Sequence, residues 1–94
     1  MSTEIKNLLP IGTVVRVKEA NKKMMIIGIL QQNKTERYDY MAILHPEGFL
    51  SEKEIYMFNH EDIEEVNYLG FMDSEFQAFR NTLIKILEEN NEDE

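Results

Sequence analysis

The chain has 94 residues, with 10 Lys and Arg against 18 Asp and Glu, which gives a formal net charge of −8 at pH 7. This length allows one domain with a modest core, and a hydrophobic content of 43% is typical of a folded protein rather than a disordered one. The absence of cysteine excludes a disulfide framework, a thiolate nucleophile and a cysteine-ligated zinc site.

The charge is unevenly distributed along the chain. Residues 1–46 carry 7 basic and 4 acidic groups (+3), whereas residues 47–94 carry 3 basic and 14 acidic groups (−11). Acids crowd the end of the chain, so we expect a single domain over residues 1–87 and an acidic, disordered tail over residues 88–94. No apolar stretch is long enough to cross a bilayer, and we expect a cytoplasmic protein with no membrane partner.

The first elements in chain order are two strands. Residues 13–18 are rich in β-branched residues and alternate in polarity, which predicts a half-buried strand. Polar residues 19–23 predict a hairpin connection to a second strand over residues 24–31, whose near-continuous apolar character suits burial on both faces. Gly28 interrupts this strand and indicates a bulge or sharp bend, a feature that lets a short sheet curl.

Three more strands are predicted before the spacing of apolar residues changes from that of a strand to that of a helix. Residues 38–44 alternate in polarity and predict the third strand, and residues 45–48 are a turn signal after it. Shorter strands are predicted around residues 55–58 and 66–69. Between them, Asn59 is a good N-cap for a short helix, because acidic residues follow it in the first turn.

The last element has helical spacing. Its apolar stripe consists of Phe76, Phe79, Leu83, Ile86 and Leu87. This spacing predicts an amphipathic helix from Ser74 onward, with Ser74 and Gln77 in a capping box and Arg80 facing water. We therefore expect an α+β fold: a small curled antiparallel sheet of about five strands, either an SH3-like partial barrel or a meander. The C-terminal amphipathic α-helix then packs across one face or open end of the sheet.

One polar cluster is the main candidate for catalysis or metal binding. It consists of His45, Glu47, His60, Glu61 and Asp62. The spacing lacks the helical histidine pair of metal sites, and neither a phosphate-binding loop nor a nucleophile elbow occurs. We therefore expect a protein that is not an enzyme and binds no cofactor or metal. A small metal-dependent enzyme or accessory that uses the His45/His60 cluster remains an alternative.

A local basic patch raises the question of nucleic-acid binding. The patch consists of Arg16, Lys18, Lys22 and Lys23, and two tyrosines that would stack on bases, Tyr38 and Tyr40, follow along the chain. A net charge of −8 repels a polyanion and does not provide the basic excess that drives phosphate binding. We therefore expect no nucleic-acid partner.

Aromatic and turn residues supply candidates for a protein interface. The chain has more aromatic residues near turns than a small core can bury, and a partly exposed patch around Phe49, Tyr68 and Phe71 would suit a partner. The complete set of candidate partner-binding residues is Pro46, Glu47, Phe49, Asn59, His60, Tyr68 and Phe71. The apolar stripe of the helix leaves a homodimer open as well.

Several separated motifs resemble a known family. They are Leu8-Leu9-Pro10-Ile11-Gly12-Thr13-Val14-Val15, Lys23-Met24-Met25-Ile26-Ile27-Gly28, Tyr38-Asp39-Tyr40, His45-Pro46-Glu47-Gly48, Phe58-Asn59-His60-Glu61-Asp62-Ile63 and Leu69-Gly70-Phe71. In this order they are similar to a small domain-of-unknown-function family. Its members are encoded in Gram-positive bacteria beside type VII secretion genes, often next to LXG toxins.

The resemblance implies a cytosolic accessory role. A chaperone or adaptor that binds an LXG toxin or another secretion substrate before export fits this context, and the expected partner is then a protein. An immunity protein that neutralises a cognate toxin is the alternative from the same gene neighbourhood. Acidic immunity proteins often gain association rate against basic toxins by electrostatic steering.

Overall fold

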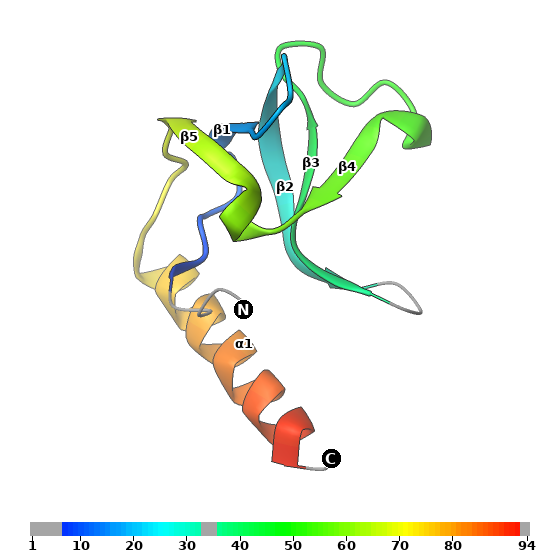
Figure 1. The fold of residues 1–94 in the computed structure, drawn as a ribbon. Coiled ribbons are helices and arrows are strands. Elements are labelled where there is room, and N and C mark those ends of the chain that lie inside the picture. Colours follow the sequence, from blue (N-terminus) through cyan, green and yellow to red (C-terminus); the bar gives the residue numbers. More distant parts are fainter. Residues whose placement is uncertain (1–6, 33–35, 93–94) are drawn as a thin grey trace.

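The described part of the computed structural model is an antiparallel sheet followed by one long helix (Figure 1). It covers residues 7–32 and 36–92, with their side chains except those of Gln32 and residues 87–92. The strands are β1 (Val14–Val17), β2 (Lys23–Gln32), β3 (Arg37–Leu44), β4 (Ile55–Phe58) and β5 (Ile63–Tyr68), and the helix is α1 (Ser74–Glu92). All strand pairs are antiparallel, which confirms the expected α+β fold.

The strand order distinguishes between the two expected sheet arrangements. The order is β4-β3-β2-β1-β5, so the first four strands form a meander and β5 returns to pair with β1. In a continuous meander β5 would pair with β4, so the order agrees with the SH3-like alternative. A short 3-10 helix, η3 (His60–Asp62), makes this return, and β5 begins at Ile63, earlier than the expected start near residue 66. Strands β4 and β5 are the two edges of the sheet.

The bulge predicted at Gly28 is present in β2. The register of β2 on β3 shifts between Ile26 and Gly28, which bends the strand. The side chain of Gln31 folds over this position, and its Nε2 donates to the carbonyl of Ile29 at 3.2 Å. A Cβ on Gly28 would lie 2.9 Å from Gln31 Nε2. The absence of a side chain at position 28 therefore leaves space for the Gln31 side chain.

The core combines strand residues with the segment that precedes β1. Its buried members are Leu8, Val15, Met24, Ile26, Ile29, Tyr40, Ala42 and Phe58. Pro10 is also fully buried, so Leu8 and Pro10 of the segment before β1 pack as part of the core. Burial of these apolar groups is the main stabilising contribution in a domain of this size.

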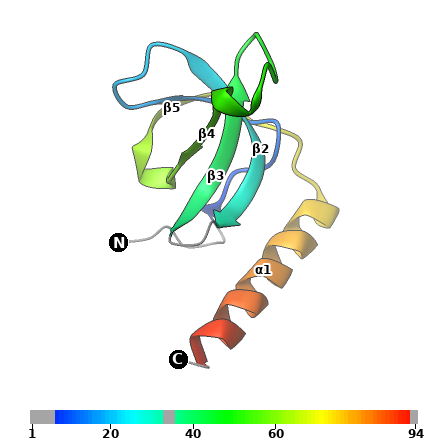
Figure 2. The ribbon, with the colours of Figure 1, turned by 90° about the vertical axis from the view of Figure 1, so that its right-hand side faces the viewer.

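Helix α1 begins at the open end of the sheet and extends away from it (Figure 1 and Figure 2). Phe76 and Leu83 pack against the core, whereas Phe79 and Ile86 are about half exposed. The backbone of α1 continues to Glu92, past the boundary expected at residue 87, and the last two residues of the expected tail lie outside the described residues. None of the helices in the described ranges has the length and apolar character that crossing a membrane requires.

The N-terminal cap of α1 differs from the prediction. Asp73 caps the helix, because its Oδ1 accepts from the Phe76 N–H at 2.9 Å and its carbonyl accepts from the Gln77 N–H at 3.1 Å. The predicted capping box of Ser74 and Gln77 is therefore wrong by one residue. An aspartate immediately before the helix supplies an acceptor and a favourable charge at the same end.

The environment of Arg80 also differs from the prediction. Its Nη1 donates to the carbonyl of Leu8 at 2.9 Å, and its guanidinium lies 5.0 Å from the centroid of the Phe76 ring. The expectation that Arg80 faces water is therefore wrong. Its side chain reaches back along the helix and holds the N-terminal segment against α1.

Candidate partner-binding surface

A buried polar junction joins β3 to η3 and to the N-terminal segment. Tyr40 is fully buried; its hydroxyl accepts from the Leu9 N–H at 2.9 Å and lies 2.6 Å from Nδ1 of His60. Burial raises the pKa of Tyr40 to about 12, so the phenol keeps its proton at neutral pH. The phenol donates to Nδ1 or accepts from it, depending on the tautomer of His60.

A second set of hydrogen bonds fixes η3 against β3. The Asp39 N–H donates to Asn59 Oδ1 at 3.0 Å, and the His60 N–H donates to Asp39 Oδ2 at 2.9 Å. The Asn59 N–H donates to Asp62 Oδ2 at 3.0 Å, and Asn59 is the N-cap of η3, as predicted. The candidate residues Asn59 and His60 therefore use polar side-chain atoms inside the fold.

The polar cluster considered for metal binding is not assembled. In residues 7–32 and 36–92, no three His, Cys, Asp or Glu side chains are placed to hold a metal ion. His45 lies in the turn after β3, whereas His60 contacts Tyr40. Glu47 pairs with Lys22 at 2.9 Å, and the hydrogen bond from this lysine lowers the pKa of the Glu47 carboxyl. These groups stabilise local structure in separate places.

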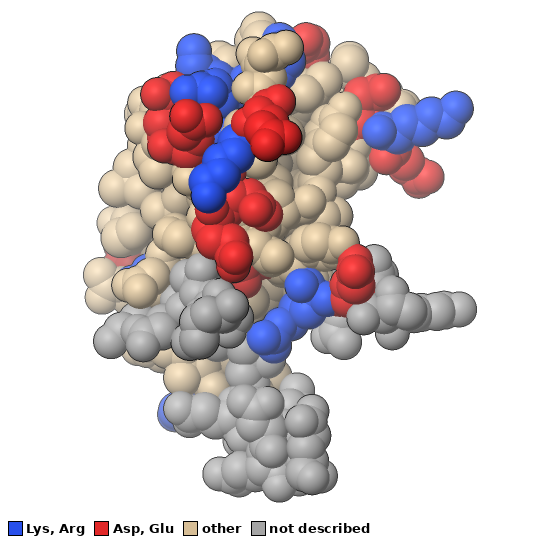
Figure 3. Space-filling model, viewed as in Figure 1, with Lys and Arg blue, Asp and Glu red and all other residues tan. Residues whose placement is uncertain are grey.

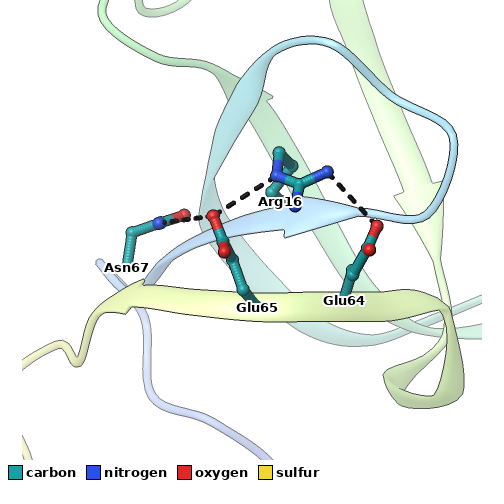
Figure 4. A network of polar contacts seen from close by, with 4 residues as sticks. All are labelled: Arg16, Glu64, Glu65 and Asn67. Atoms are coloured by element: carbon teal, nitrogen blue, oxygen red, sulfur yellow. Dashed lines mark hydrogen bonds and ion pairs between the residues drawn. The ribbon is translucent and has the colours of Figure 1, made fainter.

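The basic patch considered for nucleic acid is partly neutralised inside the protein. Arg16 Nη1 lies 3.2 Å from Glu64 Oε1, and its Nε lies 3.3 Å from Glu65 Oε1 (Figure 4). Lys22 is paired as described above, and Tyr40 is buried and cannot stack on a base. Tyr40 is therefore corrected from a stacking candidate to a core residue.

The two carboxylates reach Arg16 because β5 is irregular. Arg16 lies opposite Glu65, but the next residue of β1, Val17, lies opposite Ile63. Glu64 is thus an extra residue in β5, and the bulge changes the direction of its side chain. In a regular strand, neighbouring side chains such as Glu64 and Glu65 would point to opposite faces and could not share one guanidinium.

The same network extends to Asn67. Its Nδ2 donates to Glu65 Oε1 at 3.0 Å (Figure 4). The hydrogen bond from Asn67, followed by that from Arg16, lowers the pKa of the Glu65 carboxyl. The hydrogen bond with Glu65 in turn raises the pKa of Arg16. The positive charge of Lys23 adds to the lowering of the Glu65 pKa.

Exposed apolar side chains gather where β5 ends. Tyr68 is 65% exposed and Phe71 is 79% exposed, and Ile11 and Leu69 are about half exposed. The backbone of Gly70 lies directly against residues 11–13, so Ile11 and residues 68–71 belong to two segments that meet at Gly70. We call Ile11, Tyr68, Leu69 and Phe71 the Gly70 patch. Apolar groups exposed together in this way mark interaction surfaces.

Two observations explain why the Gly70 contact is close. A Cβ on Gly70 would lie 2.4 Å from the carbonyl oxygen of Ile11 and 2.9 Å from the Thr13 nitrogen, so a side chain does not fit. The Gly70 N–H donates to Oγ1 of Thr13 at 3.0 Å, and Thr13 is fully buried. In Figure 3 charged groups cluster at the upper left, and the surface below them, where Figure 1 places the segment leading to α1, is mostly uncharged.

The remaining candidate residues lie elsewhere. Pro46 and Glu47 lie in the predicted turn after β3, and Phe49 follows it. The turn is present: the Gly48 N–H donates to the Leu44 carbonyl at 2.8 Å, and the peptide bond before Pro46 is cis. Phe49 is 61% exposed. In the strand order, β2 and β1 lie between β3 and β5. The expected aromatic patch is therefore divided, with Tyr68 and Phe71 together and Phe49 apart.

Sequence reasoning missed two members of the Gly70 patch. Ile11 precedes the first predicted strand and Leu69 ends the last one, and the local pattern of the sequence does not bring the two residues together. The glycine between Leu69 and Phe71 was the available signal, since glycine in an extended segment often marks a close approach of two backbones.

Comparison with known proteins identifies the family of this chain. No curated protein and no solved structure matches the chain. A family model described as a domain of unknown function, DUF4176, matches residues 8–79, which include all five strands and the start of α1. The chain therefore belongs to the DUF4176 family.

Proposed function

We propose that this protein is a non-catalytic accessory factor that acts as a chaperone or adaptor for a type VII secretion substrate, such as an LXG toxin. The type VII context comes from the resemblance of the sequence motifs. The observation that carries protein binding is the Gly70 patch, in which aromatic and aliphatic side chains are exposed on a backbone held by buried contacts. Because the backbone under these side chains is already held by buried contacts, a partner does not have to order it on binding.

The charge around the patch supports a protein partner of opposite sign. Residues 61–75 contain six Asp and Glu and no Lys or Arg. An apolar surface with acidic surroundings favours a basic, apolar segment of a partner, because complementary charge speeds association and disfavours wrong partners. The same charge disfavours nucleic acid.

The internal polar contacts support a role without catalysis. The imidazole of His60 is hydrogen-bonded to Tyr40, and the carboxylate of Asp39 accepts from the backbone of η3. Groups with these contacts hold elements together, whereas a general base needs access to a substrate proton.

Affinity capture from the native cytosol tests the proposal. The tagged full-length protein is compared with a Tyr68→Ala/Phe71→Ala variant and with Phe49→Ala, a matched control of similar exposure in a different place. We expect wild type and the control to retain a secretion substrate, and the double variant to retain about ten-fold less. If wild type retains no secretion substrate at either low or high salt, the proposal is wrong.

An immunity protein is the second candidate, and the strongly acidic C-terminal half favours it. The two roles differ in the region of the toxin that is bound. A chaperone or adaptor is expected to bind outside the toxic domain and to be needed for export. An immunity protein is expected to bind the toxic domain and to protect cells that express it.

A further inference from the structure

We infer that the outer edge of β5 binds an extended, basic segment of the partner as an additional strand. This inference deepens the proposed function and rests on it for the identity of the partner as a secretion substrate. The mode of binding follows from the edge, the exposed apolar groups and the charge, all within residues 61–75.

The first step concerns the backbone of β5. Within the described residues, β5 pairs with β1 on one side and has no strand on the other. The strand spans six residues, or about 20 Å at the usual rise, which is long enough for a paired strand. Unpaired backbone N–H and C=O groups at a sheet edge are the main source of affinity when a peptide adds to a sheet.

The second step concerns protection of this edge. Natural edge strands are commonly protected by proline, by lysine, by bulges or by charges that point toward the sheet. Residues 63–68 contain neither proline nor lysine. The two charged residues of β5, Glu64 and Glu65, both contact Arg16 on β1, the neighbour on the inner side. β5 therefore has bulges and inward-facing charges, but it lacks the proline that would remove a backbone donor and the lysine that would repel a basic segment.

The third step concerns the side chains that would contact an added strand. Val66 is half exposed and Tyr68 is largely exposed, although both belong to a paired strand. Side chains that alternate along an added strand could contact these two residues and then reach Leu69 and Phe71 of the Gly70 patch. The apolar side chains of the partner segment would therefore be buried against the same edge that pairs with its backbone.

The fourth step selects the occupant. Two cations act on the carboxylates of β5: Arg16 contacts Glu64 and Glu65, and Lys23 also lowers the pKa of Glu65. Four further acids, Glu61, Asp62, Asp73 and Glu75, lie nearby in the chain, so the acidic groups remain in excess. A second copy that paired through β5 would bring two acidic strands together, which is unfavourable. A segment in which Lys or Arg alternates with apolar residues would place its cations near the acidic side chains and its apolar side chains on the exposed apolar residues of β5.

Short labelled peptides test this inference on the full-length protein. The probe alternates Lys with Val. Three matched peptides serve as controls: one with Glu in place of Lys, one with the same composition in blocks, and one with every second amide N-methylated. Binding is measured by fluorescence anisotropy, and the site is mapped from changes in the backbone amide signals by NMR.

We expect the alternating Lys peptide to bind, and its affinity to fall at least about ten-fold with N-methylation, with Glu, or with Tyr68→Ala/Phe71→Ala in the protein. Amide changes are expected in residues 63–71. Tyr56→Ala, on the opposite edge strand β4, is the control that should leave affinity unchanged. Absence of binding, equal binding of the N-methylated peptide, or changes centred on β4 or α1 would each overturn the inference.

These outcomes are separable from those of the proposed function. If cytosolic capture returns a secretion substrate but the peptides do not bind at β5, the function stands and this mode of binding is wrong. If the peptides bind at β5 but no secretion substrate is captured, the edge is a strand-binding site and the assigned function is wrong.

Discussion

The Gly70 N–H donates to Thr13 Oγ1 at 3.0 Å, across a buried contact between the start of β1 and the segment leading to α1. The two residues are 57 positions apart in the chain. Because Gly70 also lies against the backbone of Ile11, this contact fixes the backbone from which the exposed side chains of Leu69 and Phe71 extend. The surface that we assign to partner binding therefore depends on a small set of buried backbone contacts.

Gly70→Ala should destabilise the fold strongly. The new Cβ would lie 2.4 Å from the Ile11 carbonyl oxygen, and backbone atoms cannot move aside as a flexible side chain can. We expect a loss of roughly 2 kcal/mol or more in the free energy of unfolding, measured by urea denaturation. Leu69→Ala, at a half-exposed neighbour, should change it by less than about 1 kcal/mol. Equal stability of the two variants would contradict the close approach.

Thr13→Val tests the hydroxyl that accepts from Gly70. Valine keeps the shape of threonine but leaves the Gly70 N–H without its buried partner, at an expected cost of about 1–3 kcal/mol. Thr13→Ser keeps the hydroxyl and loses one methyl group. Native-state hydrogen exchange should therefore be accelerated at the Gly70 amide by valine much more than by serine. The same exchange rate at Gly70 in both variants would show that the hydroxyl is not its acceptor.

Tyr40 should produce a stability change at alkaline pH. Burial raises its pKa from 10.0 to about 12, so the neutral form is favoured in the folded state. The resulting stabilisation is complete below pH 10 and is lost as pH rises toward 12, by about 2 kcal/mol. Tyr40→Phe cannot ionise, so its stability should decline less over this range. Urea unfolding at several pH values measures the difference, and parallel pH profiles would rule out the shift.

Asn67→Ala should raise the pKa of the Glu65 carboxyl toward its ordinary value, because the Asn67 hydrogen bond is the largest cause of its lowering. The lowered pKa means that this stabilisation is present above pH 4.5 and is lost as pH falls through the pKa in the folded state. NMR titration of the Glu65 side chain gives the pKa directly. Asn81→Ala, on an exposed part of α1, is the control. An unchanged Glu65 pKa in Asn67→Ala would contradict the network.

Local patterns predicted most of the elements of this fold. The polarity of residues 38–44 and 55–58 and the glycine at position 28 indicated strands and a bulge that are present. The period of the apolar residues after Ser74 indicated α1. These features depend on neighbours in the chain, so periodicity and turn chemistry are sufficient to find them.

Features that depend on distant parts of the chain could not be read in this way. The fifth strand could pair with either edge of the four-stranded meander, β1 or β4, and the sequence of residues 63–68 alone does not indicate which. In the structure it pairs with β1. The contacts of Arg80 with Leu8 and of Gly70 with Thr13 each join residues more than 50 positions apart. The division of the candidate aromatic patch follows from the same strand order, since it separates Phe49 from Tyr68.

The most direct test of partner binding by β5 and the Gly70 patch is amide hydrogen exchange of the protein, free and in complex with its captured secretion substrate. Protection should increase in residues 63–72 and around Ile11, and Tyr68→Ala/Phe71→Ala should reduce that protection while Phe49→Ala leaves it unchanged. Protection confined to the loop after β3 or to the exposed side of α1, with none in β5, would contradict the account.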